Sequence, residues 1–274
     1  MPEGPEVQTV VNGLNNSVTG KTITGSTIID AEKLPVGLPA DLFNQLIAHQ
    51  KIARAHRRGK YINIELESGE FIVIHLMMTG HLALVGARDE YPRFTRLALH
   101  FQDGSALCFA DQRRFGTATL LRPDQMATYR GFLNLGIDIY GDEFTLENFA
   151  PLFTSRRIVH TFLLDQSKIS GLGNIYVNEA LFRAGIHPLR PADALNQEEI
   201  ARLFEAAREV TRQALYHQGT TFYSFSQPDG EGGNFQAFLR VFRKEGDPCP
   251  NCGAPIARVR INNRSAFYCP EEQR

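Results

Sequence analysis

The chain has 274 residues, which is enough for two domains with ordinary cores. Its composition is globular, with 43% hydrophobic and 22% charged residues, and this excludes extensive disorder. The opening is too polar for a signal peptide and no apolar run approaches the length of a membrane span, so we expect a cytoplasmic protein with no membrane partner.

The first segment has the pattern of a helix, because its apolar residues share one face: Val7, Val10, Val11, Leu14 and Val18. The period then changes to two. Residues 61–78 predict a hairpin around Ser68-Gly69, and residues 96–111 predict a second hairpin that turns at Asp103-Gly104. We therefore expect residues 1–125 to form a helix followed by a β-rich sandwich or barrel.

Helical patterns follow. "TLENFAPLF" begins at a plausible N-cap, Thr145, and "NIYVNEALFRAG" ends at Gly185, a residue typical of a helix C-terminus. A long amphipathic helix follows Asn196, with Glu199 placed for a capping box. The segment "SQPDGEGGN" is typical of a flexible loop with nothing to bury. These patterns predict a helical domain at 126–235 and a strand-like segment at 236–274.

The net charge of −1 indicates no partner, but the basic residues are clustered. "KIARAHRRGK" contains no acid, "DQRRFG" contains Arg113 and Arg114, and residues 252–270 contain three arginines and no acid. Three basic stretches in a neutral chain favour one cationic face that binds a phosphate backbone. Three unrelated solvated segments are the alternative.

The cysteines divide into two kinds. Cys108 lies alone in a strand pattern and is expected in the core. Cys249, Cys252 and Cys269 have the spacing of a zinc ribbon, but Glu272 stands where a fourth cysteine is expected. A site of three thiolates and Glu272, a zinc with three protein ligands, and a hairpin without metal all remain open, and the spacing favours zinc.

Three further stretches allow both a structural and a chemical interpretation. Gly171 and Gly173 precede a helix that begins at Asn174, which suits an anion site or a plain capped turn. Met78 and Phe115 could be core residues, or wedges pushed into a base stack beside Arg113. "MPEGPEV" could start a helix, or removal of Met1 could leave Pro2 as a reactive amine.

Together these motifs have the order and spacing of one family. "MPEGPEV", "RRGKYINIEL", "HLMMTG", "DQRRFG", "DQSKISGLGNIYVNEALFRAGIHPLRP", "GTTFYSF" and the basic cysteine hairpin span the chain from end to end. The chain resembles bacterial formamidopyrimidine-DNA glycosylase, which removes 8-oxoguanine and ring-opened purines from DNA. The resemblance implies an α+β multidomain fold: an N-terminal β-sandwich with a leading helix, a helix–two-turn–helix domain and a C-terminal zinc-finger-like β-hairpin.

The resemblance also implies a mechanism. Met1 is removed, the secondary amine of Pro2 attacks C1′ of the sugar, and the resulting iminium ion loses both phosphates by β and δ elimination. An α-amine has a pKa near 8, which leaves more of it unprotonated than a lysine. Glu3 matches the general acid–base residue and Glu6 matches an acid that supports the N-terminal site.

Other matches concern DNA and metal. Lys60 matches a lysine that contacts phosphate and assists catalysis. Asn174 and Arg264 match residues that hold the backbone on either side of the flipped nucleotide, and Lys168 is expected to add to that grip. Met78, Arg113 and Phe115 match the three residues that fill the hole left in the duplex by the flipped base, and Arg114 lies beside them in the sequence. One structural zinc is expected on Cys249, Cys252, Cys269 and Glu272, and the loop from Asp229 to Asn234 is expected to cover the lesion.

Gly4 departs from the pattern, because these enzymes usually have leucine there and glycine is typical of the sister enzymes that remove oxidised pyrimidines. The expected partner is damaged double-stranded DNA, bound by a monomer. A pyrimidine-specific glycosylase and a non-catalytic binder of damaged DNA are the alternatives. A plain zinc-ribbon adaptor leaves residues 1–240 unexplained.

Overall fold

The computed structural model describes residues 1–29, 38–222, 227–228 and 230–274. The chain forms two compact units. Unit 1 comprises residues 1–133 and 217–234, and unit 2 comprises residues 134–216 and 235–274. The finer division at 125 and 235 stays a prediction.

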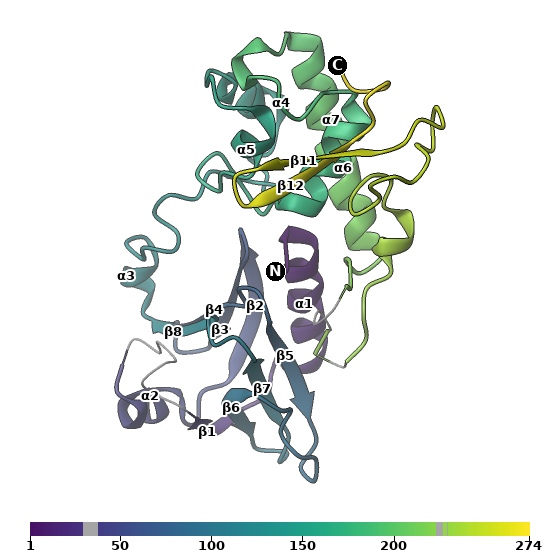
Figure 1. Cartoon of the computed structure of the whole chain (residues 1–274). Helices are drawn as coiled ribbons and strands as arrows, with labels where there is room; N and C mark the ends of the chain where they lie inside the picture. Colours follow the sequence, from purple (N-terminus) through teal and green to yellow (C-terminus); the bar gives the residue numbers. More distant parts are fainter. Residues whose placement is uncertain (30–37, 223–226, 229) are drawn as a thin grey trace. The chain divides into compact units, whose positions relative to one another are not determined.

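Unit 1 is a β-sandwich with a leading helix (Figure 1). One sheet has the order β1-β6-β7-β5 and the other has the order β2-β3-β4-β8, and every pairing in both is antiparallel. The bounds are α1 (Gly4–Ser17), β1 (Ile23–Ile28), α2 (Ala40–Ile47), β2 (Ile52–Arg58), β3 (Tyr61–Leu66), β4 (Phe71–His75), β5 (Gly80–Val85), β6 (Thr95–Phe101), β7 (Ala106–Asp111), β8 (Thr117–Leu121) and α3 (Pro123–Met126).

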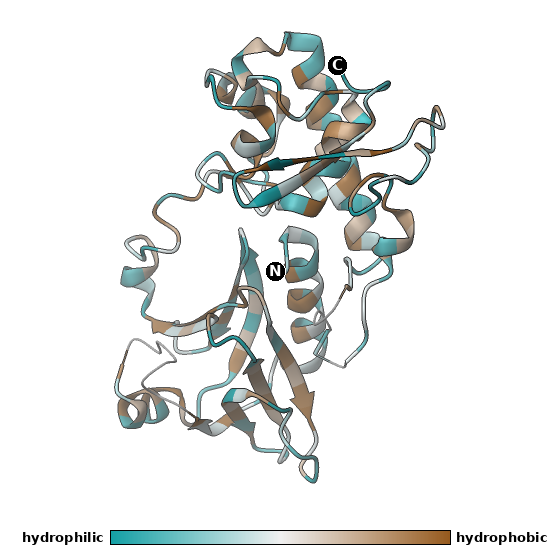
Figure 2. Cartoon of the chain, viewed as in Figure 1, coloured by the Kyte–Doolittle hydropathy of each residue, from teal (hydrophilic) through white to brown (hydrophobic). Residues whose placement is uncertain are grey.

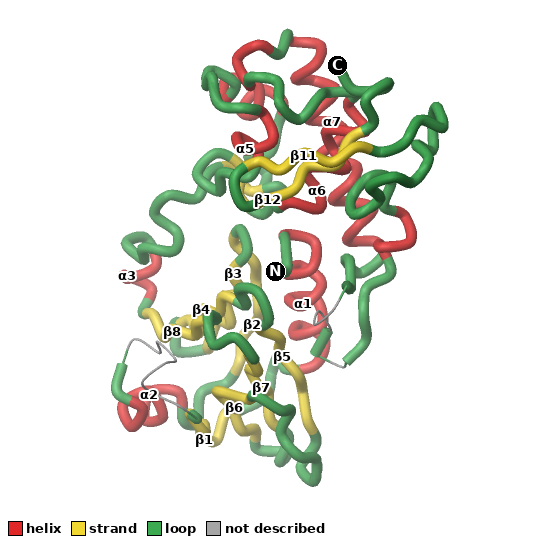
Figure 3. The backbone as a smooth tube through the Cα atoms, viewed as in Figure 1, coloured by secondary structure: helices red, strands yellow, loops and turns green. Residues whose placement is uncertain are grey.

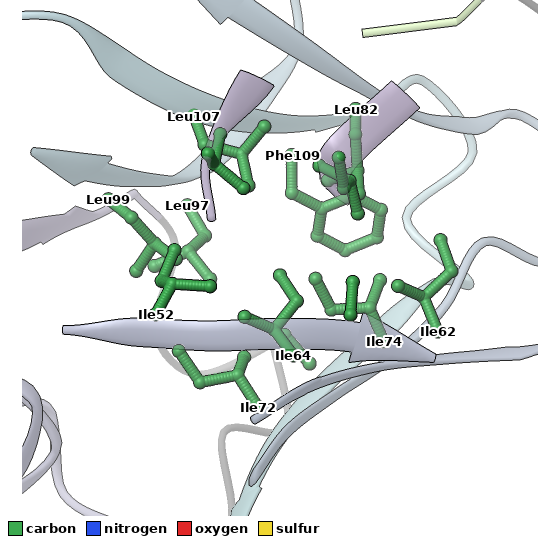
Figure 4. Close-up of a cluster of buried hydrophobic side chains, with 14 of the residues drawn as sticks. Ile52, Ile62, Ile64, Ile72, Ile74, Leu82, Leu97, Leu99, Leu107 and Phe109 are labelled. Atoms are coloured by element: carbon green, nitrogen blue, oxygen red, sulfur yellow. The ribbon is translucent and has the colours of Figure 1, made fainter. Parts of the chain in front are cut away.

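The core of unit 1 lies between the two sheets. Ile62, Ile64, Ile72 and Ile74 from one sheet face leucines and Phe109 from the other (Figure 4). Alternation in the strands produces this layer, because every second side chain points inward. The apolar face of α1 joins the same core, and apolar and polar residues alternate along this helix (Figure 2). Both predicted hairpins are present, and Cys108 is fully buried as predicted.

Unit 2 is mainly helical and carries one β-hairpin, drawn yellow in Figure 3. Its central helices α6 and α7 pack together. The bounds are β9 (Ile137–Asp138), α4 (Leu146–Phe149), η1 (Ala150–Leu152), α5 (Val159–Leu163), β10 (Ile169–Ser170), α6 (Asn174–Ala184), η2 (Ala192–Ala194), α7 (Gln197–Tyr216), η3 (Phe235–Phe238), β11 (Ala257–Ile261) and β12 (Arg264–Tyr268).

The predicted helix ends of unit 2 are confirmed. The Thr145 side chain caps α4, and Gly185 has a left-handed conformation at the end of α6 (φ 70°). Asn196 and Glu199 form a reciprocal capping box, since each side chain accepts from the other residue's N–H at 2.9 and 2.8 Å. None of the helices that the structure describes has the length and hydropathy needed to cross a membrane.

The prediction that residues 226–234 have nothing to bury is wrong for their described part. Gln227 and Pro228 are buried, and the Pro228 carbonyl accepts a hydrogen bond from Leu84 N at 2.8 Å. Leu84 belongs to β5, which is an edge strand with unpaired backbone groups. The loop satisfies one of these groups, and this long-range partner explains its burial. Residues 226 and 229 of the predicted loop and lesion cover lie outside the described part.

Candidate active site and nucleic-acid interface

The start of α1 is a buried cluster of acids. Pro2 is buried, and Glu3 and Glu6 are 5% and 2% exposed. Glu3 N donates to one carboxylate oxygen of Glu6 at 2.8 Å, and Thr220 N donates to the other at 2.7 Å. Bonds to a charged acceptor are stronger than neutral ones. Glu6 therefore fixes the backbone directly after Pro2 by tying it to a turn more than two hundred residues away.

The turn that meets Glu6 requires a glycine. Gly219 has a φ of +84°, and a Cβ there would lie 2.9 Å from Glu6 Cγ and Oε1. Both the left-handed backbone and the close approach exclude a side chain. The motif "GTTF" marks this turn in the sequence, although the motif by itself indicates no partner for it.

Lys60 lies in the turn between β2 and β3 and is 6% exposed. Arg57 holds this turn, because its guanidinium donates to Gly59 O at 2.7 Å and to Gln8 Oε1, on α1, at 3.1 Å. Burial, and secondarily the charge of Lys60, lowers the pKa of His75 to about 4. The His75 imidazole, near Lys60, is therefore neutral at physiological pH.

Two loops of unit 1 present bulky side chains to solvent. Met78 is 43% exposed and Phe115 is 51% exposed, so neither is a core residue. The guanidinium of Arg113 lies 4.9 Å from the centroid of the Phe115 ring, and Arg114 is exposed beside them. Met77 and Arg114 have left-handed backbones, with φ of 51° and 58°. Such strain costs about 1 kcal/mol per residue and is common at functional sites.

Asp111 connects these two loops and was missed by the sequence analysis. It is 1% exposed, and its carboxylate accepts from Thr79 Oγ1 at 2.5 Å and from Gly116 N at 2.7 Å. Arg113 N lies within hydrogen-bonding distance of the same carboxylate at 3.2 Å. One buried acid thus sets the positions of the loops that carry Met78 and Phe115. The signal in the sequence was its place directly before "QRRFG".

In unit 2 the first residue of α6 contacts the hairpin. Asn174 Nδ2 donates to Ser265 O at 3.0 Å, and Arg264, exposed, is the first residue of β12. Arg264 lines a hollow of about 580 Å³ together with Arg157, His160 and Gln166. Lys168 is half-buried in the turn before β10. The structure therefore brings Asn174 next to the corner of the hairpin that carries Arg264, and their predicted contacts with DNA stay a prediction.

Glu179 supports the hairpin from α6. It is 4% exposed and accepts hydrogen bonds from three successive backbone amides, of residues 240–242, at 2.9, 3.0 and 2.9 Å. Burial raises the pKa of Glu179 and outweighs the opposing effect of these amides. The chain entering the hairpin is therefore fixed to α6, by a contact that sequence spacing could not show.

Three thiols form the metal site of the hairpin. The sulfur atoms of Cys249, Cys252 and Cys269 all lie within 4.8 Å of one another. A tetrahedral zinc with Zn–S bonds of about 2.3 Å places its sulfurs about 3.8 Å apart, so the donors fit one ion. Phe182, Ile256 and Phe267 surround the buried thiols. The hairpin holds one structural zinc.

Glu272, the predicted fourth ligand, is not part of the metal-binding group found among the described residues. Its carboxylate accepts a hydrogen bond from Asn251 Nδ2 at 3.3 Å. The next residue, Gln273, is buried and bonds Cys269 N at 2.9 Å and Ile186 O at 2.8 Å. This side chain links the end of the hairpin to the end of α6 without a fourth thiol.

We expect Cys269→Ser to lose the zinc, because a fully buried thiolate is replaced by a poor ligand. Metal analysis of the purified variant should give well under half an ion per chain, against one for the wild type, and duplex affinity should fall with it. Cys108→Ser is the matched control, since that thiol is buried in a strand and lies outside the metal group. One ion per chain in Cys269→Ser would contradict the site.

Comparisons with known proteins cover nearly the whole chain. Family models match residues 1–118 (formamidopyrimidine-DNA glycosylase N-terminal domain), 135–226 (formamidopyrimidine-DNA glycosylase H2TH domain) and 246–271 (zinc finger found in FPG and IleRS). A protein of Pelotomaculum thermopropionicum named formamidopyrimidine-DNA glycosylase is 39% identical over 100% of this chain and 99% of its own length. The chain belongs to the formamidopyrimidine-DNA glycosylase family.

Solved structures of the formamidopyrimidine-DNA glycosylase family have the same fold. The MutM (Fpg) protein of Thermus thermophilus matches with a TM-score of 0.88 and 37% identity, over 99% of this chain and 98% of that one. Lactococcus lactis Fpg, in complex with abasic-site DNA, matches with a TM-score of 0.91 and 28% identity, over 99% of both chains. The same Lactococcus protein has also been solved with DNA that contains an oxidized pyrimidine. These likenesses confirm the predicted fold class.

Proposed function

We propose that the chain is a bifunctional DNA glycosylase and abasic-site lyase of base excision repair, which excises oxidised purines and then nicks the strand. The observation that carries the proposal is the buried N-terminal cluster, in which Glu6 fixes the backbone of Glu3 directly after Pro2. Membership of the family over the full length supports the same chemistry.

Pro2 is the proposed nucleophile. Removal of Met1, which is 39% exposed, frees the proline nitrogen as a secondary amine. The amine attacks C1′ of the damaged nucleotide, the bond from C1′ to the base breaks, and the base leaves with the electron pair and is protonated. The amine then loses its proton and the C1′–O4′ bond breaks, with O4′ taking up a proton, which leaves an iminium ion at C1′. This ion acidifies the adjacent C–H bonds, so loss of a C2′ proton expels the 3′ phosphate by β elimination and a further proton loss expels the 5′ phosphate by δ elimination.

Glu3 and Lys60 are the proposed assisting groups. Glu3 protonates the ring oxygen of the sugar and so helps the ring to open, while Glu6 holds the Glu3 backbone in place. Lys60, in its buried turn, contacts a phosphate beside the reacting sugar.

The proposed DNA interface has one part in each unit. Arg264, Asn174 and Lys168 grip the backbone around the flipped nucleotide. The exposed side chains Met78, Arg113, Arg114 and Phe115 fill the hole in the duplex and contact its backbone. One zinc on the three thiolates supports Arg264 through the hairpin, and Glu272 stays a proposed fourth ligand. The enzyme is proposed to act as a monomer in the bacterial cytoplasm.

The test uses duplexes with one 8-oxoguanine or one oxidised pyrimidine, and measures base release and strand nicking separately. We expect both activities, with the faster release from 8-oxoguanine. Faster release from the oxidised pyrimidine would show that the chain has the specificity of the sister enzymes that remove oxidised pyrimidines. Gly4, at the buried start of α1, favours this alternative. Tight damage-specific binding without release would show a non-catalytic binder.

Arg264→Ala is expected to weaken binding to damaged and undamaged duplexes alike, by about tenfold at low salt, because its target is a phosphate. The slope of log affinity against log salt should decrease by about one. Arg258→Ala is the matched control in the same hairpin, since Arg258 is paired with Glu245 at 3.2 Å. If Arg264→Ala binds undamaged DNA normally at every salt concentration, the assignment is wrong.

A further inference from the structure

His160, on α5, makes one hydrogen bond to Asn174, a residue of the proposed DNA grip. The imidazole is fully buried, and its Nε2 lies 3.0 Å from Asn174 Oδ1. Ser265 O can only accept, so the Asn174 NH₂ group must face Ser265 and its oxygen must face His160. His160 Nε2 must therefore carry the proton and donate it.

The protonation state of His160 is set by its surroundings. Burial lowers its pKa to about 4, the bond to Asn174 opposes this, and the positive charge of Arg264 adds to the lowering. At physiological pH the ring is neutral and carries a single proton, on Nε2. Nδ1 has no partner among the described residues, so the bond to Asn174 is the one directed polar contact of the ring within that part of the chain.

The contact matters because two side chains of α6 hydrogen-bond to the backbone of β12. Asn174 bonds Ser265 O, and Asn178, four residues later, accepts from Phe267 N at 2.5 Å. Four residues of helix rise about 6 Å and two residues of strand rise about 6.6 Å, so the two asparagines match alternate residues of β12. Asn174 holds the end next to Arg264, and Asn178 holds the strand beyond it.

Asn178 has an anchor within its own helix. Its Nδ2 donates to Asn174 O at 2.6 Å, which fixes the Asn178 amide. The Asn174 amide, at the first position of α6, is oriented on its other side by His160, from a different helix. Loss of the His160 donor would therefore release the Arg264 end of β12 and leave the Phe267 end in place.

We propose that His160 is a positioning residue for the DNA grip: it fixes the Asn174 side-chain amide and thereby the corner of the hairpin that carries Arg264. The inference rests on the proposed function for the roles of Asn174 and Arg264. It adds a residue from a different helix, in the layer behind the residues that touch DNA.

The test measures the Kd of the full-length protein for a duplex with a non-cleavable abasic-site analogue. His160→Met removes the donor at similar size and should raise the Kd about tenfold, whereas His160→Gln places an amide N–H near Nε2 and should stay within about threefold of wild type. Melting temperature and zinc content are measured for both. If His160→Met does not fold, His160→Asn replaces it, because its shorter amide does not reach Asn174.

A double-mutant cycle separates positioning from general stability. In an Asn174→Ala background, His160→Met should change the Kd by less than about twofold, because no amide remains to be oriented. An unchanged Kd in His160→Met, or the same tenfold loss with Asn174→Ala present, would overturn the inference. Wild-type protein that does not prefer the abasic duplex would instead overturn the proposed function, and Asn174→Ala that binds as wild type would overturn the proposed role of Asn174 in the DNA grip.

Discussion

An alanine inserted between Met1 and Pro2 is expected to abolish base release and strand nicking, with rates at least about 10³-fold below wild type. In the processed variant the free amine belongs to alanine, and the Pro2 nitrogen is locked in an amide with no N–H. The new amine is displaced by about one residue, or roughly 3.8 Å, and such displacements are severe because attack requires close alignment. Single-turnover assays on an 8-oxoguanine duplex measure both steps.

The control for the inserted alanine is binding. The Kd for a non-cleavable abasic duplex should stay within about threefold of wild type, since no proposed phosphate contact is altered. The melting temperature should also be close to wild type, because the insertion precedes α1, which begins at Gly4. Nicking at the wild-type rate would show that the N-terminal amine is not the nucleophile.

Glu3→Gln is expected to slow base excision by about 10² to 10⁴-fold, because it removes a proton donor and acceptor from the sugar while keeping the shape of the side chain. Glu3 is 5% exposed, so an isosteric change preserves its packing. The backbone N–H of residue 3 can still donate to Glu6. Single-turnover rates on the 8-oxoguanine duplex, with the Kd for the abasic analogue, separate chemistry from binding.

Glu67→Gln is the matched control for Glu3→Gln, because Glu67 is exposed and pairs only with Lys51 among the ion pairs that the structure describes. Its excision rate should equal that of wild type. A Glu3→Gln rate within about threefold of wild type would remove Glu3 from the mechanism and leave it a structural role at the start of α1.

The hairpins of the sandwich and the helix ends of unit 2 were predictable because their signals are local. The turns at Ser68-Gly69 and Asp103-Gly104 lie between strands of period two, and the helix caps at Thr145 and Asn196 depend on residues three positions away. The pairing of the strands into two sheets was not predictable in the same way. It depends on contacts between β1 and β6 and between β4 and β8, which are far apart in the chain.

The long-range partners of the supporting residues could not be predicted from the sequence, for the same physical reason. Glu6 meets Thr220, Glu179 meets the amides of 240–242, and Gln273 meets Ile186, all across long separations. A buried polar side chain has no periodic signature, and its partners are visible only in the fold. The wrong prediction for the loop at 226–234 has this cause as well, since Pro228 is buried by pairing with Leu84.

For Met78 and Phe115 the sequence left core and exposed positions open, because an apolar residue in a turn is compatible with both. Their exposure decides against the core. The zinc ligands show the converse case. The spacing of Cys249, Cys252 and Cys269 predicted a metal site, and the structure brings the three thiols together. Glu272 was predicted as the fourth ligand only from its position in the sequence, and it lies outside this group of thiols.

The most direct test of the account is borohydride trapping on a duplex with one 8-oxoguanine, followed by mass mapping of the adduct. Borohydride reduces an iminium ion to a stable amine and so preserves the covalent intermediate. The predicted result is one adduct, on an N-terminal peptide that begins with Pro2 and lacks Met1. An adduct on a lysine such as Lys60, or no adduct despite tight binding to the damaged duplex, would contradict it.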